Sequence, residues 1–113
     1  MQLPTTTLSL FLSLLGYVSA YNIWTCSEPN FGGECRLITT GWGGCNDLGD
    51  WGKQISSIGP DSGGWCDFWP AGSPSCHTTA GYWKYITYPG IADLGADAPA
   101  LNKNVGTYYC YAS

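Results

Sequence analysis

Hydrophobic and polar residues alternate in short runs along this chain, and clusters of Gly, Pro, Asn and Ser separate the runs. This pattern predicts β-strands, because successive side chains of a strand point to opposite faces of a sheet. Helical turns are expected only over Asp47–Trp51 and Ala92–Leu101, where Pro99 limits the length of the second. The predicted strands are 22–27, 34–39, 54–59, 64–69, 75–79, 82–88 and 105–111. The fold class is therefore all-β, a sandwich or a barrel.

The stretch from Trp24 to Ile58 carries the clearest turn signal. Pro29-Asn-Phe-Gly-Gly separates the first two runs, and its two glycines indicate a positive φ or a close approach of another segment. The later run Gln54–Ile58 brings two small hydroxyls, those of Ser56 and Ser57, which can reach the backbone of the glycine turn.

The first twenty residues have the pattern of a secretory signal peptide. Leu8–Val18 is apolar but too short to span a bilayer, and Val18-Ser19-Ala20 fits a small-residue cleavage site. We therefore expect 1–20 to be removed and 21–113 to form a single domain that is secreted and extracellular. The alternative is an uncleaved anchor. No later stretch is long and apolar enough to span a membrane.

All six cysteines follow this leader: Cys26, Cys35, Cys45, Cys66, Cys76 and Cys110. An even number in a small secreted domain predicts three disulfides, each stabilising by about 2–4 kcal/mol. Six cysteines allow about 15 pairings, and the spacing alone leaves them open. A zinc site is disfavoured, because the chain has no C-x-x-C motif and one histidine.

Four basic residues face eight acidic ones, for a net charge of −4, and no Lys/Arg cluster exists. Nucleic acid and anionic lipid are therefore not expected as partners. The one histidine, His77, adjoins Cys76, and a free thiol there would be reactive. Since the cysteines are expected to be oxidised, His77 is more simply a strand residue. We expect no enzyme activity and no cofactor.

The chain is rich in aromatic residues, with six tryptophans and eight tyrosines. Alternation predicts that Trp24 and Trp65 are buried, and Trp51 is expected in the core beside a turn. A small domain with few aliphatic residues could bury the others as well. A flat exposed ring next to Asn or Asp is also what a sugar platform or a protein hot spot needs. On that reasoning the candidate binding residues are Trp42, Trp83 and Tyr85.

An internal repeat links the two halves of the chain. Trp24, Pro29 and Cys35 recur as Trp65, Pro70 and Cys76. Asp47-Leu48-Gly49 recurs as Asp93-Leu94-Gly95, and Lys53-Gln54-Ile55 recurs as Lys103-Asn104-Val105. Two similar halves fit a duplicated β motif.

At these residues the sequence resembles the βγ-crystallin family, whose hairpin signature is an aromatic, four residues, an aromatic, any residue and glycine. Cys26, Phe31 and Gly33 hold these positions, with cysteine in place of the first aromatic. The resemblance covers about 22–69. It is poor over 70–113, where Gly72 and Pro74 fall at the two later positions of the signature.

The resemblance implies two Greek keys packed as a small β-sandwich, the first over about 21–62 and the second over about 63–113. It also implies a Cys66–Cys110 disulfide, since the first and last strands of one key are neighbours in this family.

Many members of the family bind calcium through N/D-N/D-x-x-S/T-S in each key. The matching positions here are Gly52, Lys53, Gln54, Ile55, Ser56, Ser57 and Asn102, Lys103, Asn104, Val105, Gly106, Thr107. Lysine holds the second position in both copies. A fixed ammonium repels a monovalent cation by about 4 kcal/mol at roughly 4 Å and moderate dielectric. Both calcium sites are therefore expected to be lost.

These observations predict a small secreted, cysteine-rich, non-enzymatic binding protein that is a monomer and has an extracellular protein or glycan target. Similarity to killer-toxin-like members favours a toxin, an antimicrobial factor or a host-directed effector. The alternatives are a cell-wall or glycan-binding module and a structural calcium-binding protein.

Overall fold

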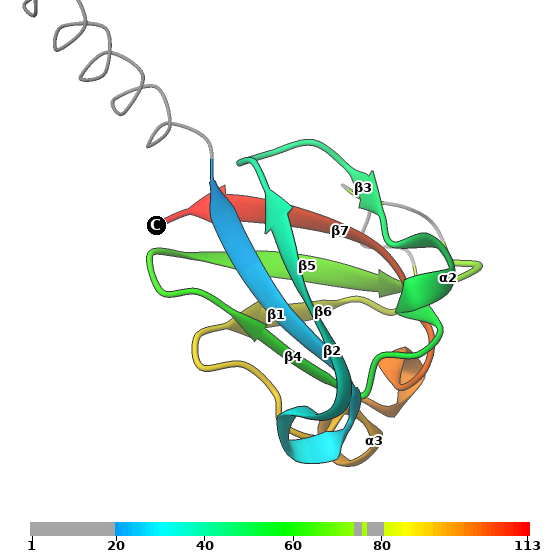
Figure 1. The fold of residues 1–113 in the computed structure, drawn as a ribbon. Helices are drawn as coiled ribbons and strands as arrows, with labels where there is room; N and C mark the ends of the chain where they lie inside the picture. The colour runs from blue at the N-terminus through cyan, green and yellow to red at the C-terminus, as the bar shows by residue number, and fades with distance from the viewer. Residues whose placement is uncertain (1–19, 74–75, 77–80) are drawn as a thin grey trace, which may run out of the picture.

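A computed structural model describes residues 20–73, 76 and 81–113, and these residues form strands with a few short helical turns (Figure 1). The elements in chain order are β1 (Tyr21–Glu28), η1 (Pro29–Phe31), β2 (Gly32–Thr40), β3 (Asn46–Asp47), α2 (Gly49–Gly52), β4 (Ser57–Pro60), β5 (Gly64–Pro70), β6 (Lys84–Thr87), α3 (Leu94–Asp97), η2 (Pro99–Leu101) and β7 (Val105–Ala112). The predicted all-β class is confirmed. The predicted strand 75–79 and His77 lie outside the described residues, except for Cys76, as does the predicted leader up to residue 19.

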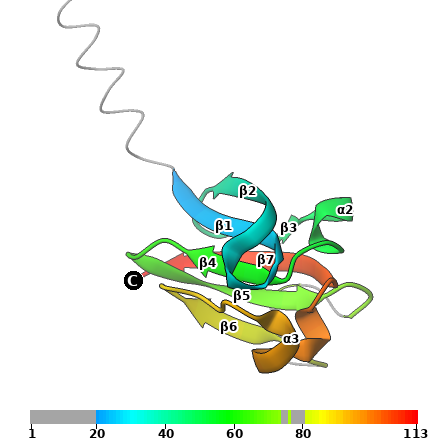
Figure 2. The same ribbon diagram turned by 60° about the horizontal axis from the view of Figure 1, so that its bottom comes forward.

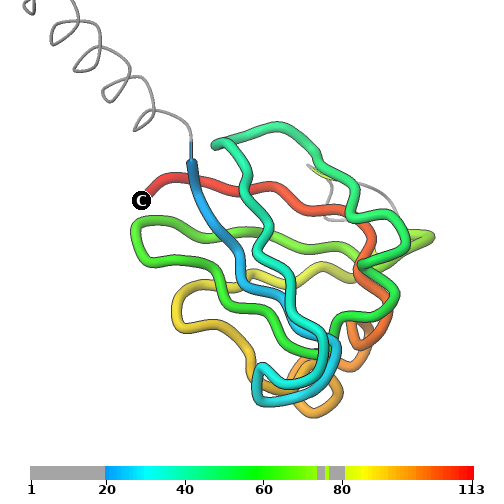
Figure 3. Tube along the Cα trace, viewed as in Figure 1, coloured from blue at the N-terminus to red at the C-terminus, as the bar shows by residue number. Residues whose placement is uncertain are grey.

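The strands form two antiparallel sheets that face each other (Figure 2). Sheet A has the order β2-β1-β4, and sheet B has the order β3-β7-β5-β6. In sheet A, β4 returns to lie beside β1, and in sheet B, β7 returns to lie beside β5 (Figure 3). A last strand that pairs with the first is the mark of a Greek key. The sandwich of two Greek keys predicted from the sequence is therefore confirmed.

Each half of the chain also sends a segment to the other half's sheet. The short strand β3 belongs to the first half but pairs with β7 in sheet B. A bridge between Ile58 and Ile91 joins the segment after β6 to β4 in sheet A. The two keys are thus interlocked rather than placed side by side.

The two copies of the Asp-Leu-Gly repeat hold this interlock by reciprocal hydrogen bonds. The Leu48 N–H donates to the carbonyl of Gly106 at 3.0 Å, and the Leu94 N–H donates to the carbonyl of Ser56 at 2.9 Å. Close packing accompanies them, since a Cβ on Gly52 would lie 2.0 Å from the carbonyl oxygen of Val105. The repeated sequence therefore marks structurally equivalent turns.

The hairpin between β1 and β2 turns through left-handed backbone. Asn30 (φ 59°), Phe31 (φ 56°) and Gly33 (φ 74°) all have positive φ. A Cβ on Gly33 would lie 2.4 Å from Oγ of Ser27, so the position requires glycine for space as well as for φ. The positive φ expected at the glycine turn is found.

Ser57 fastens this turn to β4. Its hydroxyl donates to the Glu28 carbonyl at 2.9 Å and accepts from the Phe31 N–H at 3.2 Å. The predicted contact between the serines and the turn is thus made by Ser57. Ser56 instead contributes its main chain, which donates to the Cys26 carbonyl at 2.8 Å.

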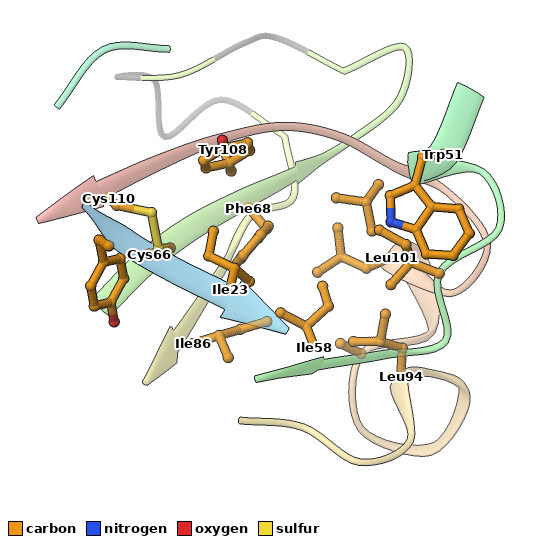
Figure 4. Close-up of a cluster of buried hydrophobic side chains, with 14 residues drawn as sticks. Ile23, Trp51, Ile58, Cys66, Phe68, Ile86, Leu94, Leu101, Tyr108 and Cys110 are labelled. Atoms are coloured by element: carbon orange, nitrogen blue, oxygen red, sulfur yellow. A yellow bond between two sulfur atoms is a disulfide. The ribbon is translucent and has the colours of Figure 1, made fainter. Parts of the chain in front are cut away.

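The core lies between the two sheets and extends toward the helical turns (Figure 4). Its buried members are Tyr21, Ile23, Trp51, Ile55, Ile58, Cys66, Phe68, Ile86, Leu94, Ala98, Leu101, Val105, Tyr108 and Cys110. The predicted burial of Trp51 is confirmed. Its Nε1 donates to Oγ1 of Thr25 at 2.8 Å, and that hydroxyl donates to the Arg36 carbonyl at 2.7 Å. The one polar atom of the indole is therefore satisfied inside the core.

The prediction that Trp24 is a core residue is wrong. Ile23 and Thr25 face inward on β1, and the side chain between them points out of the sandwich with 42% of its surface exposed. The alternation was correctly predicted, but its phase was not, because β1 buries the aliphatic and hydroxyl positions instead of the indole. The predicted strand 54–59 is shorter than expected and begins at Ser57, since the Gln54 N–H is bonded to the Trp51 carbonyl in the preceding turn.

Three disulfides join the six cysteines: Cys26–Cys35, Cys45–Cys76 and Cys66–Cys110. The last pair, which the family resemblance implied, connects β5 and β7 inside the core (Figure 4). The first pair crosses the β1–β2 hairpin at residues that face each other in register. Cysteine at the first position of the hairpin signature thus replaces ring packing with a covalent bond.

An aromatic face on sheet B as the candidate functional site

The outer face of sheet B carries aromatic side chains because its strands alternate. On β5, Cys66 and Phe68 are buried in the core, so Trp65 and Asp67 point the other way. On β7, Cys110 is buried, and Tyr109 and Tyr111 flank it on the opposite face. The same logic puts Tyr85 of β6 on this face, since the adjacent Ile86 is buried.

Four of these rings form one row across three strands, which we call the aromatic row: Tyr85, Trp65, Tyr111 and Tyr109. Successive ring centroids are 5.8 Å apart from Tyr85 to Trp65, 5.0 Å from Trp65 to Tyr111 and 4.6 Å from Tyr111 to Tyr109. The Trp65 and Tyr111 planes lie within 19° of parallel, and the two residues are direct cross-strand partners. Such pairs stabilise a sheet surface and hold its rings in place.

Asp67 lies beside the aromatic row, with Tyr85 and Tyr109 as its cross-strand neighbours. Burial raises the pKa of the Asp67 carboxyl, and a hydrogen bond from the Tyr111 hydroxyl lowers that pKa in part. The pKa of Tyr111 is raised in turn by burial and by the nearby charge of Asp67. Within the described chain, Oδ1 of Asp67 is buried and has no hydrogen-bond partner. The carboxylate is therefore held among rings, with Oδ1 shielded from solvent and without a donor in the described chain.

The structure separates the three binding residues predicted from the sequence. Tyr85 is a member of the aromatic row and is 50% exposed. Trp83 immediately precedes β6 and packs with Trp69 at a centroid distance of 6.5 Å. Trp42 instead packs on Tyr21 at 4.4 Å, at the end of the sandwich.

The sequence reasoning missed four members of this face: Trp65, which was assigned to the core, and Asp67, Tyr109 and Tyr111. A signal was present, because both Trp65/Asp67 and Tyr109/Tyr111 have the two-residue spacing of one strand face. The missing information was the pairing of β5 with β7, which brings the two spacings into register.

The predicted remnants of calcium motifs contain a tethered ammonium in the second copy. Nζ of Lys103 donates to the carbonyls of Ser27 and Gln54, the latter at 3.4 Å, and lies 3.5 Å from Oε2 of Glu28. These oxygens, from the end of β1 and from the turn before β4, surround a lysine instead of a metal ion.

Lys53, the equivalent residue of the first copy, is more loosely placed. Its Nζ lies 3.9 Å from Asp50 and it is largely exposed. Among the described residues, no group of three or more His, Cys, Asp or Glu side chains could hold a metal ion. That these motifs do not bind calcium stays a prediction, and the Lys103 ammonium supplies a physical reason for it.

Two interlocked Greek keys, the first with a folded hairpin between β1 and β2, define a βγ-crystallin-type fold. A solved structure described as "Evolution of the eye lens beta-gamma-crystallin domain fold" superposes with a TM-score of 0.61 at 13% sequence identity, covering 84% of this chain and 89% of that one. The protein therefore has the βγ-crystallin domain fold. No protein-family model and no curated protein sequence matches the chain. In the described part of the chain, no helix has the length and apolarity needed to cross a bilayer.

Proposed function

We propose that this chain is a small, disulfide-stabilised, non-enzymatic protein that works outside the cell by binding a polysaccharide on the aromatic row. The observation that carries this proposal is a continuous row of four rings beside a carboxylate, on the outer face of a rigid sheet. The disulfides and the expected signal peptide support an extracellular site of action. Recognition residues on strands are held more firmly than residues on loops.

The chemistry of the face favours a sugar over the other ligands of aromatic surfaces. Stacked bases of single-stranded nucleic acid would bring phosphates toward Asp67 in a chain of net charge −4. A sugar is neutral, has apolar C–H faces that pack on rings, and has hydroxyls that can bond with tyrosine hydroxyls and with a carboxylate. Tyr85, which is 50% exposed, presents a ring and a hydroxyl to such a ligand.

A pull-down on insoluble chitin, cellulose and β-glucan tests this proposal. Tyr85→Ala removes the most exposed ring of the row, and it should weaken binding about two- to tenfold, as expected for the loss of one aromatic contact. Leu37→Ser is the matched control, because Leu37 is 53% exposed and lies on β2 of the other sheet. The proposal would be refuted if none of the three polysaccharides retained the protein, or if each retained wild type and Tyr85→Ala equally.

A toxin, antimicrobial or host-directed effector role is the biological setting that the sequence predicts for such binding. A purified mature chain applied to competing microbes or host tissue tests that setting. If the chain binds a polysaccharide but affects none of a broad panel of microbes and host tissues, the glycan-binding role is supported and the toxin role is rejected.

A further inference from the structure

A second aromatic cluster lies on the outer face of sheet A, on a different layer from the aromatic row. It lines a groove of about 260 Å³. The lining residues are Trp24, Phe31, Gly59, Pro60, Asp61, Tyr88 and Pro89. They come from β1, η1, β4 with the residue that follows it, and the segment after β6. The groove is therefore assembled by the fold from four separate segments.

The floor of the groove is open because Gly59 is the register partner of Trp24. A Cβ at Gly59 would lie 3.2 Å from a ring carbon of Phe31 and 3.1 Å from the Pro89 carbonyl oxygen. Any larger residue would thus enter the space that the rings surround. Trp24 remains 42% exposed and Tyr88 61% exposed, so two of the walls present ring surface to solvent.

The third ring is fixed by the main chain of the turn that bears it. Phe31 has φ 56°, and its N–H is bonded to the Ser57 hydroxyl. The neighbouring Asn30 N–H donates to the Ala92 carbonyl at 2.7 Å. A turn bonded to two other segments holds its ring in a defined place, so the wall is preformed.

The groove contains one acidic side chain, that of Asp61. Its main chain is anchored, since its N–H donates to the Asn22 carbonyl at 3.0 Å and its carbonyl accepts from the Tyr21 hydroxyl. The basic side chains that form ion pairs in the described residues do so with Glu34, Asp50 and Glu28, and none pairs with Asp61. An exposed carboxylate among rings in an acidic protein is complementary to a cation.

We propose that this groove binds a trimethylammonium group of the choline type. A neutral apolar ligand would leave Asp61 unused, and a sugar would find few polar partners besides Asp61 and the Tyr88 hydroxyl. A primary ammonium or a guanidinium needs several acceptors for its N–H groups. A trimethylammonium group has no N–H, presents methyl groups to ring faces and is attracted by both rings and carboxylate. The groove is smaller than the roughly 300–1,000 Å³ of sites for drug-sized ligands, which suits a small headgroup.

Isothermal titration of the folded chain with choline and with 3,3-dimethyl-1-butanol tests this inference. The two compounds have nearly the same shape, but the alcohol carries a carbon in place of the charged nitrogen. We expect choline to bind at least tenfold more tightly than the alcohol. Asp61→Asn, which keeps the main-chain bonds, and Trp24→Ala should each weaken choline binding at least fivefold. Asp97→Asn, which removes an exposed carboxylate on α3 that does not line the groove, should not.

Several results would overturn the inference. They are equal affinity for choline and the neutral alcohol, no binding of choline in the millimolar range, or unchanged binding in Asp61→Asn. A peptide with trimethyllysine that binds when choline does not would overturn the choline assignment in favour of a protein ligand. Circular dichroism melting of each variant separates loss of binding from loss of folding, and Asp61→Asn keeps the test valid if Trp24→Ala is unstable.

Discussion

Replacement of Lys103 by methionine keeps most of the side-chain stem but removes the ammonium. That ammonium links the turn of Lys103 to two other segments of the chain. Nζ of Lys103 contacts the carbonyl oxygens of Ser27 and Gln54 and the carboxylate of Glu28. One lysine thus connects the last turn before β7 to the first hairpin and to the turn before β4. We expect the free energy of unfolding to fall by about 1–2 kcal/mol.

The magnitude follows from the exposure of the partners. The side chains of Lys103 and Glu28 are 45% and 61% exposed, so their ion pair at 3.5 Å contributes no more than about 1 kcal/mol. Hydrogen bonds from a charged donor to two carbonyls add more, about 1.5–3 kcal/mol each when fully buried. Here the partial exposure lets water replace most of that contribution, so the expected total is only about 1–2 kcal/mol.

Thermal unfolding followed by circular dichroism measures the effect as a fall in Tm of roughly 5–15 °C for a domain of this size. Lys53→Met is the matched control, because Lys53 is the repeat equivalent of Lys103, is largely exposed and has one ion pair at 3.9 Å. It should change the unfolding free energy by less than about 0.5 kcal/mol. If both lysine variants melted within a degree of the wild type, the tethered ammonium would have no structural role and this reasoning would be wrong.

Three further predictions concern the core, the aromatic face and the degenerate motifs. Trp51→Phe loses the bond from Nε1 to Thr25 and should cost about 1–3 kcal/mol, measured by urea unfolding. Burial in the folded state raises the pKa of Asp67, so its ionisation at neutral pH opposes folding. This penalty disappears as the pH falls through the folded-state pKa toward the ordinary pKa of an aspartate. Asp67→Asn should therefore be at least as stable as the wild type at pH 7, and the difference between the two should shrink in acid; a large loss of stability at pH 7 would contradict this. Millimolar calcium should leave the Tm of the wild type unchanged, because a ligand of the native state would raise it.

Much of the fold was predictable because its local signals agree with its global topology. The turn at Phe31–Gly33 needs left-handed backbone, and the sequence supplies Asn30 and glycine there. The repeated Asp-Leu-Gly turns were visible as a repeat because both copies make the same hydrogen bond to the opposite half. Short strands with clear alternation could be placed within a few residues.

The candidate site was less predictable, because it depends on pairings that no local pattern fixes. Alternation indicates that one face of β1 is buried, but it does not indicate which face. Trp24 is therefore predicted in the core, whereas it lies on the outer face and lines the groove. The aromatic row needs β5 to lie between β6 and β7, and that order follows from the closure of the second Greek key. Tyr85 could be named as a candidate from its own stretch of sequence. Trp65 and Tyr111, in contrast, form a site only because the pairing of β5 with β7 places them opposite each other.

The placement of the aromatics supports the recognition role that we propose for them. The core is filled mainly by aliphatic residues. It also contains aromatic residues such as Phe68, Tyr108 and Trp51, and the disulfide between β5 and β7 runs through it. Trp24 and Tyr85 stand outside this core on opposite layers, where a polar residue would satisfy a strand equally well. Exposed rings on both outer faces increase the tendency to aggregate, and the disulfides and the core supply most of the stability of the fold. The proposed ligands would cover these rings, so removal of Tyr85 or Trp24 should weaken binding far more than it lowers the Tm.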